Sequence, residues 1–302
     1  MAAAATGLRS LMSEKKLLVA PGVFDAYTAR IIESLGFEAI YLGGNALGLQ
    51  LCIGQPFVTA SETVNAVSRI RRAVGLPIIV DAGAGFGDAA HTFVATRELE
   101  RAGASAIHID DQVYPKRAHY HRGVGHLSDV EVVVDKLAAA VAARRDPDFM
   151  VIARTDALRV TGSVDQTIAR AKACAGAGVD AVLVLDLGIE AAAEFRAALP
   201  GVPLVWMGGI AEPVPLQQEL ESAGFSMALY PFNTAGAITE AVLATWQDAR
   251  TAGRPARPSV PTAQSVKKAL SLIDMERLWD IEARTTEKPR QSASRPTPEE
   301  TQ

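Results

Sequence analysis

Eight short apolar segments recur along this chain of 302 residues, and a longer stretch with helical periodicity separates each from the next. Because they are continuous apolar runs that do not alternate with polar residues, they are typical of strands buried on both faces of a parallel sheet. Eight such strands with intervening helices predict a (β/α)₈ barrel of the α/β class more readily than a doubly wound sheet. The segments are LLVA from Leu17, AIYLG from Ala39, PIIVDAG from Pro77, AIHID from Ala106, FMVIART from Phe149, AVLVL from Ala181, LVWM from Leu204 and MALYP from Met227.

The segments between the predicted strands have the pattern of amphipathic helices. Residues 25–35, 61–74 and 129–144 carry apolar side chains at helical spacing, and Gly103 ends a further segment with a glycine of the kind that often follows a helix. No GxGxxG or GxxxxGK[ST] motif follows an early strand. A nucleotide-binding fold therefore lacks its main support in the sequence.

The barrel is predicted to occupy residues 1–250. A Pro-rich connector and a C-terminal helix are predicted over residues 251–284, and the polar residues 285–302, rich in Pro, Ser and Glu, are expected to be disordered. An apolar stripe on this helix must pack on the barrel or on a neighbouring subunit, because the barrel is already complete before it. The stripe consists of Val266, Leu270, Leu272, Ile273 and Leu278.

The composition argues against several classes of function. A formal net charge of −4 provides no basic surface for nucleic acid. Cys52 and Cys174 are isolated, which indicates a reducing compartment and argues against disulfides or a cysteine-based zinc site. The N-terminus has no signal-peptide pattern, and no apolar run reaches the roughly 18 residues of a membrane span. We expect a cytoplasmic protein with no nucleic-acid or membrane partner.

Polar residues at the ends of the predicted strands form the candidate site, because such barrels carry their active sites at the C-terminal ends of the strands. Asp81 and Asp110 offer hard oxygen ligands that suit Mg²⁺, and Arg154 can bind a substrate carboxylate through two parallel hydrogen bonds. The alternative is that strand-end aspartates cap the following helices, a role that the sequence also predicts for Asp88 and Asp129. The other candidates at strand ends are Asp111, Asp156 and Asp186.

Four motifs together resemble the isocitrate lyase/phosphoenolpyruvate mutase family, and in particular its 2-methylisocitrate lyase-like and carboxyphosphonoenolpyruvate mutase-like members. They are VDAGAGFG, AIHIDDQVYPKR, DPDFMVIARTDA and MALYP, and the similarity runs over residues 21–231. The resemblance implies a barrel whose C-terminal helix is swapped between the subunits of a homotetramer. It also implies Mg²⁺-dependent chemistry, with Mn²⁺ as a substitute, on small 2-oxo or 2-hydroxy carboxylic acids through an enolate.

The resemblance also implies roles for individual residues. Asp81 and Asp110 match the carboxylates on the metal side, although Asp110 is one methylene shorter than the glutamate that is usual there. Lys116 and Arg117 match the basic pair that opens the catalytic loop. The substrate-binding positions are Arg154, for a carboxylate, and the backbone N–H groups of Gly43, Gly44 and Asn45.

Several positions depart from the family pattern, and the loop after the fourth strand departs most. Gly83, Gln55, Leu185 and Met207 replace polar or acidic residues, and Asp186 can substitute for the acid missing at Leu185. Where lyases of the family have Lys-Arg-Cys-Gly-His, this chain has Lys116, Arg117, Ala118, His119 and Tyr120.

An alanine has no proton to donate, so Tyr120 or His119 is the candidate replacement acid. A zinc or iron site of His119, His121 and His126 is one alternative, and an ordinary polar surface loop is another. His108 lies inside a predicted strand, where a core histidine is expected.

Three functions are compatible with these residues. The first is a Mg²⁺-dependent carbon–carbon lyase that acts on a small 2-hydroxy or 2-oxo di- or tricarboxylic acid. The second is a phosphonomutase, a decarboxylase, or a carbon–carbon or carbon–phosphorus hydrolase of the same family, in which loss of the cysteine is tolerated. The third is a catalytically silent relative that binds a carboxylic acid. We expect the lyase, because Asp81, Asp110, Lys116 and Arg154 occur together.

Overall fold

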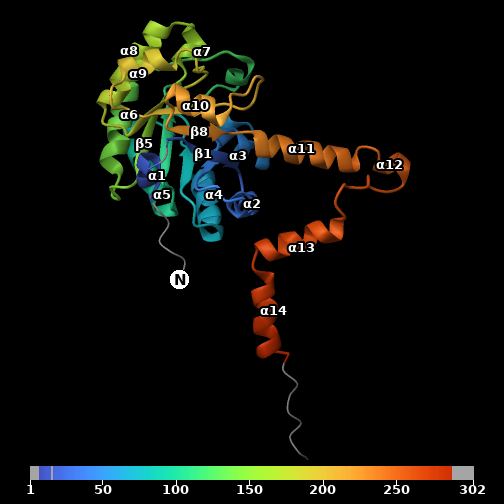
Figure 1. The fold of residues 1–302 in the computed structure, drawn as a ribbon. Helices are drawn as coiled ribbons and strands as arrows, with labels where there is room; N and C mark the ends of the chain where they lie inside the picture. Colours follow the sequence, from blue (N-terminus) through green and yellow to red (C-terminus); the bar gives the residue numbers. More distant parts are fainter. Residues whose placement is uncertain (1–6, 15, 288–302) are drawn as a thin grey trace, which may run out of the picture. The chain divides into compact units, whose positions relative to one another are not determined.

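Eight parallel strands close into a barrel in the order β1 to β8 (Figure 1). The structure, a computed structural model, describes residues 7–14 and 16–287. β8 pairs with β1, with Leu18 opposite Met227, and this pairing closes the barrel. The predicted (β/α)₈ barrel is confirmed, and each of the eight apolar segments matches one strand. The strands are β1 (Leu18–Val23), β2 (Ile40–Leu42), β3 (Ile78–Asp81), β4 (Ala106–Asp110), β5 (Met150–Thr155), β6 (Ala181–Val184), β7 (Leu204–Met207) and β8 (Met227–Tyr230).

The helices of the barrel begin and end largely where the sequence supplies caps. Asp88 accepts a hydrogen bond from His91 N at the start of α5, and Gly103 ends that helix with a positive φ of 102°. Asp129 is the N-cap residue of α6, as predicted, but its side chain makes no capping hydrogen bond. The helices are α1 (Leu8–Glu14), α2 (Ala26–Ser34), α3 (Gly44–Gln50), α4 (Ala60–Ala73), α5 (Ala89–Ala102), α6 (Val130–Ala143), α7 (Ala157–Thr161), α8 (Val164–Gly176), α9 (Ala192–Ala198), α10 (Gln217–Ala223) and α11 (Asn233–Trp246), with short 3₁₀ helices η1 (Gln55–Phe57) and η2 (Ala118–Arg122).

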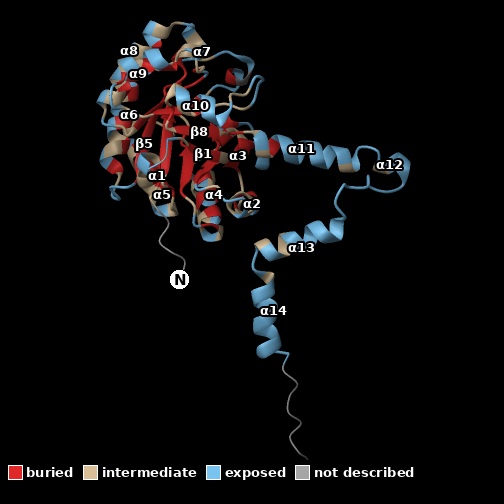
Figure 2. Cartoon of the chain, viewed as in Figure 1, coloured by how far each residue is buried: buried red, intermediate tan, exposed pale blue. Residues whose placement is uncertain are grey.

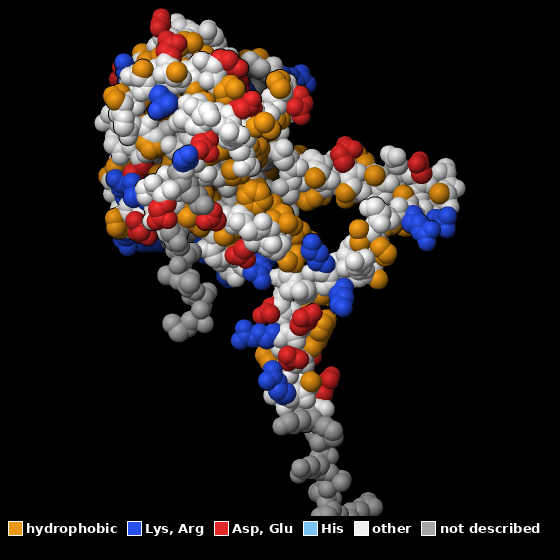
Figure 3. All heavy atoms as spheres, viewed as in Figure 1, with side chains coloured by type: hydrophobic (Ala, Val, Ile, Leu, Met, Phe, Trp, Pro, Cys, Tyr) orange, Lys and Arg blue, Asp and Glu red, His pale blue; other side chains and the backbone are white. Residues whose placement is uncertain are grey.

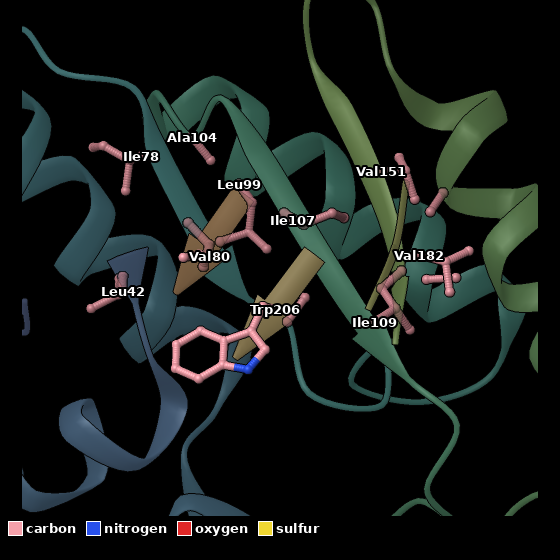
Figure 4. Close-up of a cluster of buried hydrophobic side chains, with 14 of the residues drawn as sticks. Leu42, Ile78, Val80, Leu99, Ala104, Ile107, Ile109, Val151, Val182 and Trp206 are labelled. Atoms are coloured by element: carbon pink, nitrogen blue, oxygen red, sulfur yellow. The ribbon is translucent and has the colours of Figure 1, made fainter. Parts of the chain in front are cut away.

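Two layers of apolar side chains stabilise the barrel. The inner layer includes Leu18, Ile79, Ile152 and Leu183 from the strands, and α1 adds Leu8 and Leu11 to it. Burying each such aliphatic side chain contributes about 1.5–3 kcal/mol. Figure 2 shows the strands as the buried centre, and Figure 4 shows part of the outer layer between strands and helices. The labelled residues of that layer are Leu42, Ile78, Val80, Leu99, Ala104, Ile107, Ile109, Val151, Val182 and Trp206.

The chain divides into two compact units, Met1–Ala244 and Thr245–Gln302. In the second unit the single C-terminal helix of the prediction is replaced by α12 (Ala249–Ala252), α13 (Thr262–Leu272) and α14 (Met275–Arg284). Asp274, with a left-handed φ of 62°, separates α13 from α14.

Within this second unit the apolar stripe is only partly covered. Val266, Ile273 and Leu278 are half-exposed, and Figure 3 shows hydrophobic side chains at the surface of α13 and α14. Residues 288–302 of the predicted tail lie outside the described residues. Among the helices that the structure describes, none has the length and apolar character to cross a membrane.

Candidate active site

Three of the predicted site residues lie together at the C-terminal ends of neighbouring strands. Asp81 ends β3, Asp110 ends β4 and Arg154 lies near the end of β5, and their exposed fractions are only 6%, 1% and 6%. Asp110 N donates to Gly83 O at 2.8 Å, which links the segments that follow β3 and β4. A pocket opens beside Asp81, and its polar or charged lining includes Gln55, Thr63, Tyr114 and Lys116.

Asp81 is held by three hydrogen-bond donors. It accepts from Gly83 N at 2.8 Å, from Gln55 Nε2 at 3.1 Å and from Gly44 N at 3.2 Å. Burial would raise the pKa of Asp81, but His108, Lys116 and Arg154, together with the hydrogen bond from Gly83 N, outweigh burial and lower that pKa well below its ordinary value. Asp81 is therefore a fixed carboxylate at the bottom of the pocket.

Gly44 is required by this close packing. A Cβ atom at this position would lie 2.9 Å from Gln55 Nε2 and 3.1 Å from Asp81 Oδ2. Gly43 is the N-cap residue of α3, and Asn45 lies half-buried in the first turn of that helix. The backbone segment that was predicted to bind the substrate therefore lies beside Asp81. The N–H group of Gly44 already donates to this carboxylate.

Asp110 is paired with Lys116. Lys116 Nζ lies 2.5 Å from Asp110 Oδ2, and both side chains are almost completely buried. Burial raises the pKa of Asp110, while the charge of Lys116 partly opposes that rise. Gln112 Nε2 lies 3.4 Å from Asp110 Oδ2 and also donates to Asp156 Oδ2 at 2.7 Å. The Gln112 amide thus joins the Asp110 side of the site to the Arg154 side.

Arg154 is fixed by Asp156 and contacts Tyr120. Its Nε donates to Asp156 Oδ1 at 2.8 Å, and its Nη2 donates to Asp156 Oδ2 at 3.2 Å and to Tyr120 Oη at 2.9 Å. Arg159 Nη1 donates to the same Tyr120 oxygen at 3.1 Å. Burial raises the pKa of Tyr120 well above its ordinary value, so this side chain is a neutral phenol near neutral pH.

Not every predicted residue joins this cluster. Arg117, Ala118 and His119 are exposed, whereas Tyr120, in the same 3₁₀ helix η2, is buried against Arg154. Asp186 is half-exposed and contacts Arg159, outside the Asp81 pocket. The side chain of His121 is outside the described part of the structure, so the zinc or iron hypothesis stays a prediction.

Two residues of the cluster had no role in the sequence-based hypothesis. Gln112 follows Asp110 and Asp111 directly, and this position in the loop after β4 is the only signal that points to it. Arg159 belongs to the short helix α7, five positions after Arg154, and no motif marks it. Gln112 and Arg159 belong to the site because of their side-chain hydrogen bonds in the folded chain.

His108 is buried in β4 next to Asp81, so the core position is as expected, but its hydrogen bonding is not fully satisfied within the described part of the chain. Its Nε2 lies 2.8 Å from Tyr41 Oη, while its Nδ1 has no hydrogen-bond partner among the described residues and lies 3.9 Å from Asp81 Oδ1. Burial lowers the pKa of His108 from 6.5 to about 4, so the folded protein holds it neutral.

We predict that His108 makes stability fall on acidification. Between pH 6.5 and 4 the unfolded chain binds a proton at His108 that the folded chain does not bind, so folding stability is lost as pH falls through this window. The full effect is roughly 3 kcal/mol. Urea unfolding of the wild type and of His108→Gln at pH 7 and pH 4.5 should show the stability advantage of the wild type shrinking at the lower pH. An advantage that stays constant would contradict the buried neutral histidine.

The fold and the site together define a class of protein. Buried carboxylates, a lysine and an arginine converge at the catalytic end of a (β/α)₈ barrel, where enzymes of this fold carry out their chemistry. The chain belongs to the phosphoenolpyruvate phosphomutase family, whose model matches residues 8–250. It is an enzyme of the isocitrate lyase/phosphoenolpyruvate mutase family, as the sequence predicted.

Its relatives include named lyases. The chain is 35% identical over 287 residues to the 2,3-dimethylmalate lyase of Eubacterium barkeri, covering 92% of this chain and 96% of the relative. It is 37% identical over 232 residues to the 2-methylisocitrate lyase of Aeropyrum pernix, covering 75% and 73%. Among solved structures it is similar to phosphonopyruvate hydrolase in complex with oxalate and Mg²⁺, with a TM-score of 0.81, 28% identity and coverage of 92% and 98%.

Proposed function

We propose that this protein is a Mg²⁺-dependent carbon–carbon lyase that cleaves a small 2-hydroxy di- or tricarboxylic acid through an enolate. The observation that carries the proposal is the fixed Asp81 carboxylate, which lies among the positive charges of Lys116 and Arg154. That arrangement suits an anionic substrate held beside a metal ion. The names of the two lyase relatives support a carbon–carbon cleavage.

The charges of the site fit a divalent cation. Four buried carboxylates, Asp81, Asp110, Asp111 and Asp156, lie near the buried cations Lys116, Arg154 and Lys136. Mg²⁺ keeps several waters and needs only one or two carboxylates, which Asp81 and Asp110 would supply, and Mn²⁺ would bind in the same way. When bound, the metal supplies a Lewis acid that stabilises negative charge on the enolate oxygen.

The side chains of this protein then divide the remaining work. Asp156 takes the two-point hydrogen bonding of Arg154 that the sequence suggested for a substrate, and Tyr120 shares Nη2. The Nη1 group is proposed to bind a substrate carboxylate instead. Lys116 places positive charge beside the hydroxyl oxygen that loses its proton. The backbone N–H groups of Gly43, Gly44 and Asn45 are proposed to bind the substrate, for which Gly44 N would exchange its hydrogen bond to Asp81.

Tyr120 is the proposed acid that protonates the carbon of the enolate. It is buried against Arg154, whereas His119 and Arg117 on the same loop are exposed. Because His119 is exposed, Tyr120 is the better candidate for the acid. Arg117 is proposed to act as a neighbour of this acid in the loop. A proton donor must lie within hydrogen-bond reach of its acceptor, and only Tyr120 of the loop candidates has a hydroxyl on the Arg154 side.

A second candidate function keeps the same pocket but needs no loop acid. The solved phosphonopyruvate hydrolase covers nearly the same length of chain, and the exposed Ala118 stands where lyases have their cysteine. A hydrolase, phosphonomutase or decarboxylase would use Asp81 and Arg154 but would not depend on Tyr120 as a proton donor. The glycine at Gly83 and the apolar Leu185 and Met207 are the features that would suit a silent binding relative.

We further propose a cytoplasmic homotetramer. The half-exposed Val266, Ile273 and Leu278 give α13 and α14 apolar surface that assembly would bury. Exchange of these helices between subunits is one way to bury it. Light scattering of the full chain and of a chain ending at residue 250 would test whether the second unit is needed for assembly.

Thermal unfolding with Mg²⁺, with oxalate as an enolate mimic, and with both tests the proposed site. Ligands that bind only the folded state stabilise it by roughly 2.7 kcal/mol at a hundredfold excess over Kd. We expect an increase in Tm that needs both ligands and disappears in Asp81→Ala, but remains in the exposed control Asp88→Ala. No increase at millimolar concentrations would overturn the proposed metal and enolate site.

A further inference from the structure

Arg159 connects the candidate acid to a second ion pair. Its Nε and Nη2 donate to the two carboxylate oxygens of Asp186 at 2.6 and 2.7 Å, and its Nη1 donates to Tyr120 Oη at 3.1 Å. The guanidinium also lies 5.7 Å from the centre of the Tyr120 ring. Arg159 therefore contacts both the oxygen and the ring of Tyr120 while Asp186 holds its other two nitrogens.

The Arg159–Asp186 pair is poorly explained as a stabilising contact. Its side chains are 35% and 49% exposed, and exposed ion pairs contribute only about 0–1 kcal/mol. Asp186 also adopts a left-handed backbone with a φ of 63°, which is uncommon outside glycine although aspartate tolerates it better than most residues. The two hydrogen bonds from Arg159 to Asp186 are better explained by the contact that they orient, which is the hydrogen bond from Arg159 Nη1 to Tyr120 Oη.

Two guanidinium groups thus converge on the Tyr120 oxygen, and a separate aspartate fixes each of them. Asp156 holds Arg154 by two hydrogen bonds, and Asp186 holds Arg159 by two. Such planar two-point pairs restrict the guanidinium orientation. The phenol oxygen is therefore placed by donors from α7 and β5 that have little freedom to turn.

This placement matters when the phenol transfers its proton. In that step the Tyr120 O–H bond breaks, its electron pair stays on Oη, and the enolate carbon uses its own electron pair to form a C–H bond. Negative charge then appears on Oη, and the N–H donors of both arginines stabilise it. Water protonates Oη again after the products leave.

We propose that Arg159, held by Asp186, is a positioning residue that orients Tyr120 and stabilises its phenolate during enolate protonation. This inference rests on the proposed lyase function. Without Arg159, Arg154 would be the one remaining guanidinium of the two that donate to the phenol oxygen. Arg159 supplies the second donor and acts on the substrate only through Tyr120.

The first test is spectroscopic and needs no substrate. The chain has only five tyrosines, so ¹³C-labelling of the ring Cζ and comparison with Tyr120→Phe identify the Tyr120 signal. Arg159→Met should shift this signal, and Arg159→Lys should restore part of the shift. Arg101→Met, which removes a comparable exposed ion pair with Glu98, should leave it in place. An unshifted Tyr120 signal in Arg159→Met would overturn the inference.

The second test uses turnover of whichever 2-hydroxy acid the wild type cleaves. Arg159→Met should lower kcat about 10- to 100-fold, the usual effect of removing a residue that orients a functional group, with little change in KM. The solvent deuterium isotope effect on kcat should rise, and Arg159→Lys should recover part of the rate. A wild type that cleaves no acid overturns the proposed function. Full turnover in Arg159→Met beside an active wild type overturns only the role of Arg159.

Discussion

Tyr120→Phe is expected to lower kcat about 10²- to 10⁴-fold, the range typical for loss of a general acid. The phenylalanine ring keeps the packing of the buried tyrosine, but it removes the hydroxyl that accepts from Arg154 and Arg159. KM should change little, because the proposed contact of Arg154 Nη1 with the substrate carboxylate is kept. Steady-state kinetics of the wild type and the variant measure the effect.

Two neighbours in the same loop serve as matched controls. His119→Gln and Ala118→Ser alter exposed positions and should leave kcat within a few-fold of the wild type, as surface substitutions usually do. If His119→Gln loses the activity and Tyr120→Phe keeps it, the assignment of the acid is wrong. If neither variant loses activity while the protein still turns over, the reaction needs no loop acid, as in the hydrolase or decarboxylase alternative.

Asp81→Asn should lower kcat/KM by about 10³-fold or more, comparable with loss of a group that stabilises charge in the transition state. The amide keeps the size of the side chain and can still accept from Gly83 N, so the fold should survive. It removes the negative charge with which Asp81 would help to hold a metal ion.

Titration with Mg²⁺ separates the metal effect from simple damage to the pocket. The variant should need far more Mg²⁺ for half-maximal activity, whereas Asp88→Asn, an exposed helix cap, should match the wild type. An unchanged Mg²⁺ requirement in Asp81→Asn would show that the metal, if used, binds elsewhere.

The barrel was predictable because its information is local. Continuous apolar runs, helical spacing and a glycine stop such as Gly103 each report on their own segment, and their order fixes the topology. Strand ends then indicated Asp81, Asp110 and Arg154 without knowledge of any contact. The break at Asp274 was missed because apolar periodicity continues across it.

The proposed acid and its neighbours were harder to predict because their contacts are distant in sequence. Arg159 and Asp186 are 27 positions apart, and Tyr120 and Arg159 are 39 apart. The sequence showed a polar loop with several proton donors, and it left His119 and Tyr120 equal. Burial distinguishes them, since only the folded chain places Tyr120 beside two arginines while His119 stays in solvent.

The Gln112 amide between Asp110 and Asp156 has a consequence for how the two halves of the site respond to their ligands. Its nitrogen contacts both carboxylates, so a change of charge at one alters how strongly the amide is drawn to the other. A cation bound at the Asp110 side and an acid bound at the Arg154 side are then thermodynamically linked. The cation must change the affinity of the site for the acid by the same factor by which the acid changes its affinity for the cation.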